Sequence, residues 1–118
     1  MKYSIFAFFL VFLNLSCSQT KSKSITEVSQ KELDKVVLID VRTPDEFNAG
    51  HLHNALNIDW FDAAFQKKIE AAVPKDKTVY VYCKVGGRSA KAAEKLNALG
   101  YTVVNLEGGY DAYIKAQK

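Results

Sequence analysis

Residues Thr78–Leu96, which read TVYVYCKVGGRSAKAAEKL, contain in order a strand-forming run, a cysteine, a pair of glycines and a helix-forming run. The β-branched and aromatic residues of Thr78–Tyr82 predict a strand. The Ala, Lys, Glu and Leu residues of Ser89–Leu99 predict a helix, which Gly100 would end. The sequence therefore predicts a strand–loop–helix unit with Cys83 at the carboxyl end of the strand.

The alternative for this unit is a hairpin through Gly86 and Gly87, or a buried cysteine followed by an ordinary turn. A hairpin would need a second strand after the glycines. The residues in that place, Ser89–Leu96, are strong helix formers. We therefore favour the helix.

The same alternation of strand and helix runs through the rest of the chain after residue 24. Apolar runs predict further strands at Ile25–Val28, Val36–Asp40, Ala55–Ile58 and Thr102–Leu106. Capping residues and apolar spacing predict helices at Ser29–Lys35, Pro44–Ala49, Trp60–Val73 and Tyr110–Gln117. We therefore expect an α/β fold, in which a central, mainly parallel sheet of about five strands is flanked by helices on both faces.

The composition limits the chain to one domain. Of its 118 residues, 48% are hydrophobic and 25% are charged, which is enough for a single modest core. The net charge is +3, and acidic and basic residues are mixed along the chain. This mixture argues against a dedicated nucleic-acid-binding surface.

The N-terminal residues have the features of a targeting segment. A lysine at position 2 precedes Ile5–Leu13, an unbroken apolar run that is too short for a permanent transmembrane helix. Ser16 is a small residue directly before Cys17, and this arrangement resembles a bacterial lipoprotein signal. Ordinary secretion and an uncleaved anchor remain as alternatives, because Asn14 departs from the lipoprotein pattern.

The lipoprotein interpretation divides the chain into three parts. We expect a signal peptide at residues 1–16, a lipidated flexible tether at residues 17–23 and the folded domain at residues 24–118. The domain would be anchored to a membrane of the bacterial cell envelope through Cys17 and would lie on the periplasmic side. A structural disulfide between Cys17 and Cys83 is the alternative use of the two cysteines.

The predicted surroundings of Cys83 favour an ionised thiol. The tight loop Lys84–Gly87 can direct several backbone N–H groups inward, and the beginning of the next helix adds partial positive charge. Lys84 and Arg88 add full positive charges, and the hydroxyl group of Ser89 can donate a hydrogen bond to the sulfur. We therefore expect the pKa of Cys83 to be low and its thiolate to be a nucleophile.

Two other segments carry recognisable signatures. Asp40–Ala55, DVRTPDEFNAGHLHNA, matches the pattern D-V-R-x-x-x-E-F-x-x-G-H-[IL]-x-x-A. Leu106–Tyr113, LEGGYDAY, matches L-x-G-G-x-x-A-W with Tyr113 in place of the tryptophan. With the cysteine loop between them, residues 24–118 resemble the rhodanese-like sulfurtransferases.

This resemblance implies a function for the loop. Cys83 would accept a sulfane sulfur as a persulfide from a donor such as thiosulfate, and a thiol, cyanide or an envelope protein would take it away. No metal or organic cofactor is needed. Arg88 would assist Cys83 in catalysis. The sulfur would be bound by the loop residues Lys84, Val85, Gly86, Gly87, Arg88 and Ser89.

Two other functions compete with this interpretation. Protein tyrosine phosphatases use a C-x5-R loop, whereas only four residues separate Cys83 from Arg88, and a smaller ring of donors suits a single sulfur atom. The main alternative is a non-catalytic rhodanese-like module that binds a partner or senses oxidants through Cys83.

The remaining polar and aromatic residues have structural interpretations. We expect Asp40 and Arg42 to support the fold, with Arg42 paired to Glu46 or Asp45. A metal site formed by Cys83 and the two histidines lacks a pattern that would complete it. The histidines are His51 and His53, and the aromatic residues expected in the core or at the rim of the pocket are Trp60, Phe61 and Phe65.

Overall fold

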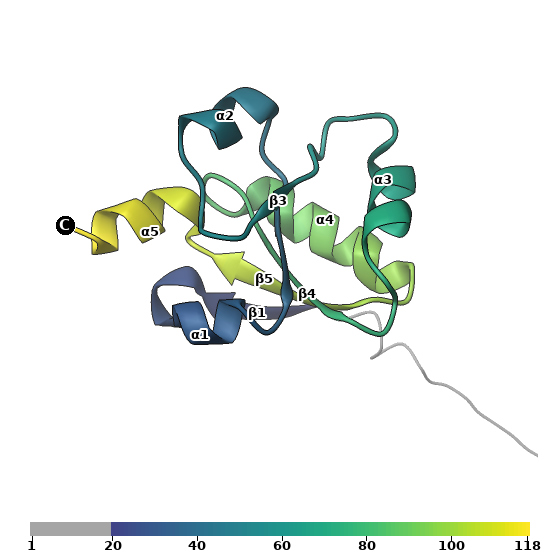
Figure 1. Ribbon diagram of the computed structural model, residues 1–118, viewed down its shortest axis with the longest axis horizontal. Helices are drawn as coiled ribbons and strands as arrows, with labels where there is room; N and C mark the ends of the chain where they lie inside the picture. The colour runs from purple at the N-terminus through teal and green to yellow at the C-terminus, as the bar shows by residue number, and fades with distance from the viewer. Residues whose placement is uncertain (1–19) are drawn as a thin grey trace, which may run out of the picture.

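The computed structural model describes residues 20–118 (Figure 1). The predicted signal peptide at residues 1–16 and the predicted lipidation site Cys17 lie outside the described residues, so both stay predictions. Within residues 20–118, no helix has both the length and the apolar composition that crossing a bilayer requires.

A five-stranded sheet forms the centre of the domain. Its strands are β1 Lys21–Ser24, β2 Val37–Asp40, β3 Leu56–Asn57, β4 Thr78–Tyr82 and β5 Thr102–Glu107. Their order across the sheet is β1-β5-β4-β2-β3, and each neighbouring pair is parallel. The predicted α/β architecture is therefore confirmed, with β4 in the middle of the sheet.

Helices cover both faces of this sheet (Figure 1). They are the 3-10 helix η2 Ile25–Glu27, α1 Gln30–Leu33, α2 Pro44–Ala49, α3 Phe65–Ala72, α4 Gly87–Ala98 and α5 Gly109–Ala116. Successive side chains of a strand point to opposite faces, so β4 contributes to two clusters. Val79 and Val81 pack with residues of α3 and α4, whereas Tyr80 and Tyr82 pack with residues of η2, α1 and α5.

Helix α2 forms as its local sequence predicts. The side chain of Thr43 accepts a hydrogen bond from the N–H of Glu46, and the carboxylate of Glu46 accepts one from the N–H of Thr43. This reciprocal capping box, together with Pro44 in the first turn, fixes where the helix begins. The chain enters α2 from the carboxyl end of β2, so α2 lies at the end of the sheet where ligands bind in parallel α/β folds (Figure 1).

The first strand is not where the sequence predicts it. The strand expected at Ile25–Val28 is wrong, because Ile25–Glu27 forms η2, with the side chain of Ser24 accepting a hydrogen bond from the N–H of Thr26. Residues 21–23, expected in the flexible tether, instead pair with β5 as part of β1. An edge strand pairs through its backbone on one side only and needs no apolar face, so its sequence KSKS carries no strand signal.

Helix α3 begins later than its apolar pattern predicts. The helix expected from residue 60 starts at Phe65. Before it, Asp59 and Asp62 each accept a hydrogen bond from the backbone N–H two residues further on, at 2.9 and 2.8 Å. Such local turns compete with helix formation. They leave Phe61 outside the core, with 68% of its surface exposed.

Candidate active site

Cys83 lies at the carboxyl end of the central strand β4, directly before the loop that leads into α4. Its side chain is 1% exposed. Gly86, the N-cap of α4, has a φ angle of 128°, which side chains other than glycine rarely adopt. The turn at Gly86 directs its own N–H group back to the sulfur.

The sulfur of Cys83 accepts hydrogen bonds from the loop backbone and from a side-chain hydroxyl group. The N–H of Gly86 lies 3.0 Å from Sγ, and the hydroxyl oxygen of Ser89 lies 3.4 Å from it. Burial raises the pKa of Cys83, but the Ser89 hydroxyl and the N–H groups of Ser89, Gly86 and Arg88 act against it, and the pKa is lowered overall. The loop therefore favours the thiolate, which is the nucleophilic form of cysteine.

Both cationic side chains of the loop are paired with carboxylates. Lys84 Nζ lies 2.7 Å from Oδ2 of Asp111 in α5. The guanidinium group of Arg88 binds Glu46 through two contacts, Nη1 to Oε1 at 2.7 Å and Nη2 to Oε2 at 3.0 Å. The hydrogen bond from Arg88 is the main reason that the pKa of Glu46 is lowered to about 2. Glu46, which the sequence did not place at this site, thus contacts a residue predicted to be catalytic.

The predicted pairing of Arg42 with Glu46 or Asp45 is wrong. Arg42 is 4% exposed and binds the fully buried carboxylate of Asp40, with Nε and Nη2 lying 2.6 to 3.1 Å from its oxygens. Arg42 also donates a hydrogen bond to the carbonyl oxygen of Gly50 and lies 4.3 Å from the ring centroid of Tyr110. Its planar charged group thus joins β2, the end of α2 and α5.

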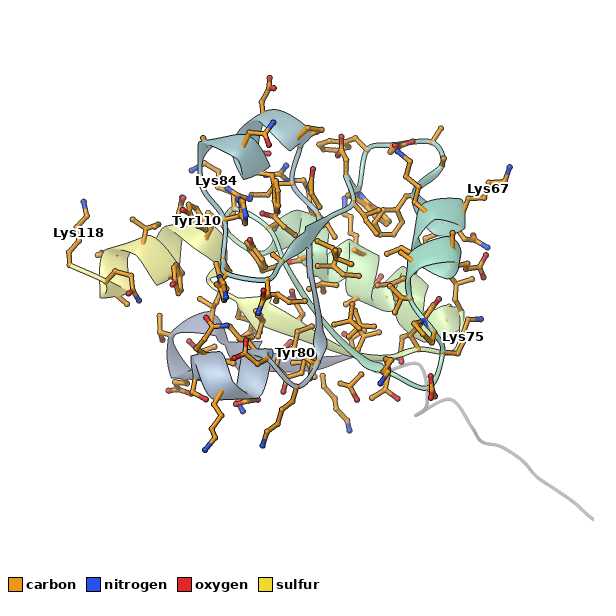
Figure 2. All side chains as sticks on the ribbon, viewed as in Figure 1. Lys67, Lys75, Tyr80, Lys84, Tyr110 and Lys118 are labelled. Atoms are coloured by element: carbon orange, nitrogen blue, oxygen red, sulfur yellow. The ribbon has the colours of Figure 1, made fainter. Side chains whose placement is uncertain are left out.

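A second backbone segment supports the cysteine loop. The carbonyl oxygens of Cys83 and Lys84 accept hydrogen bonds from the N–H groups of Tyr110 and Asp111, at 2.8 and 3.1 Å. Gly109 lies between the two backbones with a φ angle of 64°, and a Cβ atom there would be 2.5 to 2.6 Å from those carbonyl oxygens. Figure 2 shows Lys84 and Tyr110 at the same end of the domain. The glycine pair of the C-terminal signature therefore allows a close approach to the loop.

Two apolar side chains are exposed at the loop. Val85 is 65% exposed and Phe61 is 68% exposed. The guanidinium carbon of Arg88 lies 5.8 Å from the ring centroid of Phe61. Of the other aromatic residues expected in the core or at the rim, Phe65 is buried and Trp60 packs edge-on against it. The rim of the candidate site thus combines paired charges with apolar surface.

The two histidines do not form a metal site with Cys83. The ring of His51 stacks on Phe47 with centroids 3.7 Å apart, and its Nδ1 lies 2.9 Å from the Phe47 carbonyl oxygen. His53 lies on the exposed turn after it. In the described part of the chain, no group of three or more His, Cys, Asp or Glu side chains could hold a metal ion.

Comparisons with known proteins relate this arrangement to a family. A model of the rhodanese-like domain matches residues 25–116. An uncharacterized protein, YqhL of Bacillus subtilis, is 39% identical over 97% of the chain and 94% of its own length. The thiosulfate sulfurtransferase PspE of Escherichia coli is 42% identical over 60% of the chain and 67% of its own length. The structure of the human single-domain sulfurtransferase TSTD1 is 28% identical, with a TM-score of 0.64 over 82% of the chain and 97% of TSTD1.

Replacing Ser89 by alanine should raise the pKa of Cys83. The change removes the hydroxyl donor to Sγ, whereas the backbone donors stay in place. In the wild type, the rate of Cys83 alkylation should reach half its maximum below the pH of about 8.5 typical of a free cysteine. In Ser89→Ala the midpoint should move to higher pH.

Mass spectrometry of the Cys83 peptide measures the alkylation midpoint of the wild type and of the variant. Ser29→Ala is the control, because the side chain of Ser29 caps α1 instead. A wild-type midpoint at or above the free value would contradict the proposed role of the loop.

Alanine at two glycines of this region should have opposite effects on stability. Gly109→Ala should lower the free energy of unfolding by about 1–3 kcal/mol or more, because of its positive φ and the two nearby carbonyl oxygens. Gly87→Ala should be neutral or stabilise by up to about 1 kcal/mol, since nothing lies within 4 Å of its Cβ position. Urea denaturation of both variants measures the difference, and equal effects would show that Gly109 is not constrained as described.

Proposed function

Because the chain belongs to the family of rhodanese-like domains, we propose that it is a sulfurtransferase that carries a sulfane sulfur as a persulfide on Cys83. The observation that carries this proposal is the position of Sγ. It lies at the carboxyl end of the central strand and accepts hydrogen bonds from the N–H of Gly86 and the hydroxyl of Ser89. Donors at this point stabilise negative charge on sulfur.

With thiosulfate as donor, the thiolate of Cys83 attacks the outer sulfur. The S–S bond of thiosulfate breaks, sulfite leaves with the electron pair, and a new S–S bond makes the Cys83 persulfide anion. A thiolate or cyanide then attacks the terminal sulfur, forms a persulfide or thiocyanate, and releases the Cys83 thiolate. Both steps are nucleophilic displacements at sulfur through a covalent intermediate, and neither needs a metal or an organic cofactor.

Anionic sulfur is present before, during and after each transfer. The hydrogen bonds that lower the pKa of Cys83 act on the resting thiolate. The N–H groups at the beginning of α4 can act on the terminal sulfur of the persulfide in the same way. Only four residues lie between Cys83 and Arg88, and a loop of that length suits one sulfur atom better than a phosphate group.

The names of two relatives support the same reaction. PspE is called a thiosulfate sulfurtransferase, and TSTD1 a single-domain sulfurtransferase. TSTD1 resembles this domain over nearly all of its own length. The name of TSTD1 thus supports the view that one rhodanese-like domain is sufficient for sulfur transfer.

Wild-type protein exposed to thiosulfate should gain one sulfur atom, about 32 mass units, on Cys83 and lose it on addition of cyanide. Cys83→Ser should take up no sulfur, while its unfolding transition stays close to that of the wild type, because the two side chains are similar in size. Intact-protein and peptide mass spectrometry follow the transfer. If no donor loads the wild type while the same surface retains an envelope protein, a binding module is the better description.

We also propose that Cys17 carries a lipid anchor that holds the domain at a membrane of the cell envelope, on its periplasmic side. The apolar run Ile5–Leu13 and the small residue before Cys17 support this proposal. In the described part of the chain, β1 begins at Lys21, four positions after Cys17 in sequence.

The wild type should therefore be found in the membrane fraction, and Cys17→Ala should release the protein or leave it unprocessed. Several acyl chains on one residue give stable anchoring, whereas a single chain gives marginal binding. Cell fractionation and immunoblotting measure the distribution, and Cys83→Ala is the control because it removes the other cysteine. A wild type that is entirely soluble would contradict the anchor.

A further inference from the structure

The cysteine loop is less positively charged in the folded domain than its sequence suggests. Lys84 and Arg88 make the loop cationic in sequence, but Asp111 and Glu46 each place a carboxylate 2.7 Å from these cations. The pair formed by Arg88 and Glu46 is the better ordered of the two, because its side chains are only 21% and 29% exposed and its contacts are bidentate.

Glu46 is held in place independently of Arg88. Its Oε1 accepts hydrogen bonds from the N–H and the hydroxyl group of Thr43, at 3.0 and 3.1 Å, in the capping box of α2. Its Oε2 accepts a hydrogen bond from Arg88 and none from Thr43. A helix cap thus presents a fixed carboxylate to the one arginine of the cysteine loop.

This fixed carboxylate matters because sulfane-sulfur donors differ in charge. Thiosulfate carries two negative charges, whereas a thiosulfonate or a persulfide carries one. A free arginine would favour the dianion most strongly, and a neutralised arginine loses that preference. The exposed ring of Phe61 next to Arg88 is apolar, as is the exposed side chain of Val85 in the loop, and neither replaces the lost positive charge.

We propose that Glu46 is a specificity-determining residue that acts through Arg88 and makes the site discriminate against doubly charged sulfur donors. This inference rests on the proposed sulfurtransferase function and refines it. Thiosulfate remains a donor, but the site suits sulfane sulfur carried by a singly charged organic group, with Phe61 and Val85 next to its apolar part.

The test compares two donors that react in the same way but differ in charge. Thiosulfate releases sulfite, and methanethiosulfonate releases methanesulfinate; in both, the thiolate attacks the sulfane sulfur and the leaving group takes the electron pair. With cyanide as acceptor, thiocyanate formation by the full chain gives kcat/KM for each donor. In ping-pong transfer this constant reports only the half-reaction with the donor.

Glu46→Gln is the informative variant, because glutamine keeps an acceptor oxygen for the Thr43 cap but removes the charge. We expect kcat/KM to rise about tenfold for thiosulfate and about threefold for methanethiosulfonate, because the logarithm of the effect should scale with donor charge. Added salt should reduce the gain. Arg88→Gln should lower thiosulfate use, since it leaves the carboxylate unopposed, and Glu46→Gln combined with Arg88→Gln should lie between the two single variants.

Two matched controls separate charge from structure. Thr43→Val removes the hydroxyl partner of the cap but no charge, so the ratio of the two kcat/KM values should stay as in the wild type. Glu70→Gln makes the same chemical change at an ion pair with Lys75, which Figure 2 shows at the end of the domain away from Lys84. Its donor ratio should also be unchanged.

The possible failures are distinguishable. If Glu46→Gln lowers thiosulfate use, or changes both donors by the same factor, Glu46 has only a structural role and the inference is wrong while sulfur transfer stands. If the wild type forms a persulfide with neither donor, the proposed function fails and the inference fails with it.

Discussion

The close contact between the backbone of Gly109 and the carbonyl oxygens of Cys83 and Lys84 is the constraint on which the site depends. Carbonyl groups at the end of a central strand need hydrogen-bond partners when they are buried, and here the N–H groups of Tyr110 and Asp111 supply them. Only a residue without a Cβ atom can lie between the two backbones at this distance. The C-terminal signature therefore supports the position of the cysteine through its backbone. Within residues 20–118, no side chain of that signature donates a hydrogen bond to the sulfur.

The loop itself resolves a conflict between burial and charge. A cysteine that is 1% exposed would ordinarily stay protonated, because its thiolate loses the solvation of water. Hydrogen bonds from Ser89 and from the loop backbone reverse that preference. The stabilisation is local to the sulfur, so the loop does not need a free cation, which agrees with the engagement of both Lys84 and Arg88 by carboxylates.

The N-terminal signature acts at two levels. Asp40 and Arg42 form a buried ion pair, and Arg42 also contacts Gly50 and Tyr110, so the pair joins β2 to both. The bidentate hydrogen bonds between the two side chains compensate for the solvation that both charges lose on burial. Glu46, four residues further on, closes the cap of α2 with one oxygen and binds Arg88 through both. A single carboxylate thus links the folding of a local helix to the charge of the candidate active site.

The sequence by itself determined the features that depend on short-range chemistry. The capping box at Thr43 and the strand–loop–helix unit around Cys83 follow from residues a few positions apart, so α2, β4 and α4 lie close to their predicted ranges. Tertiary structure alone decided where β1 pairs, because the KSKS backbone bonds to β5 whatever its side chains are. Tertiary structure also decided the partners of two arginines. Arg42 is close in sequence to Asp45 and Glu46 but binds the buried carboxylate of Asp40. Glu46 precedes Arg88 by 42 positions in sequence and contacts it only because parallel strands bring their carboxyl ends together.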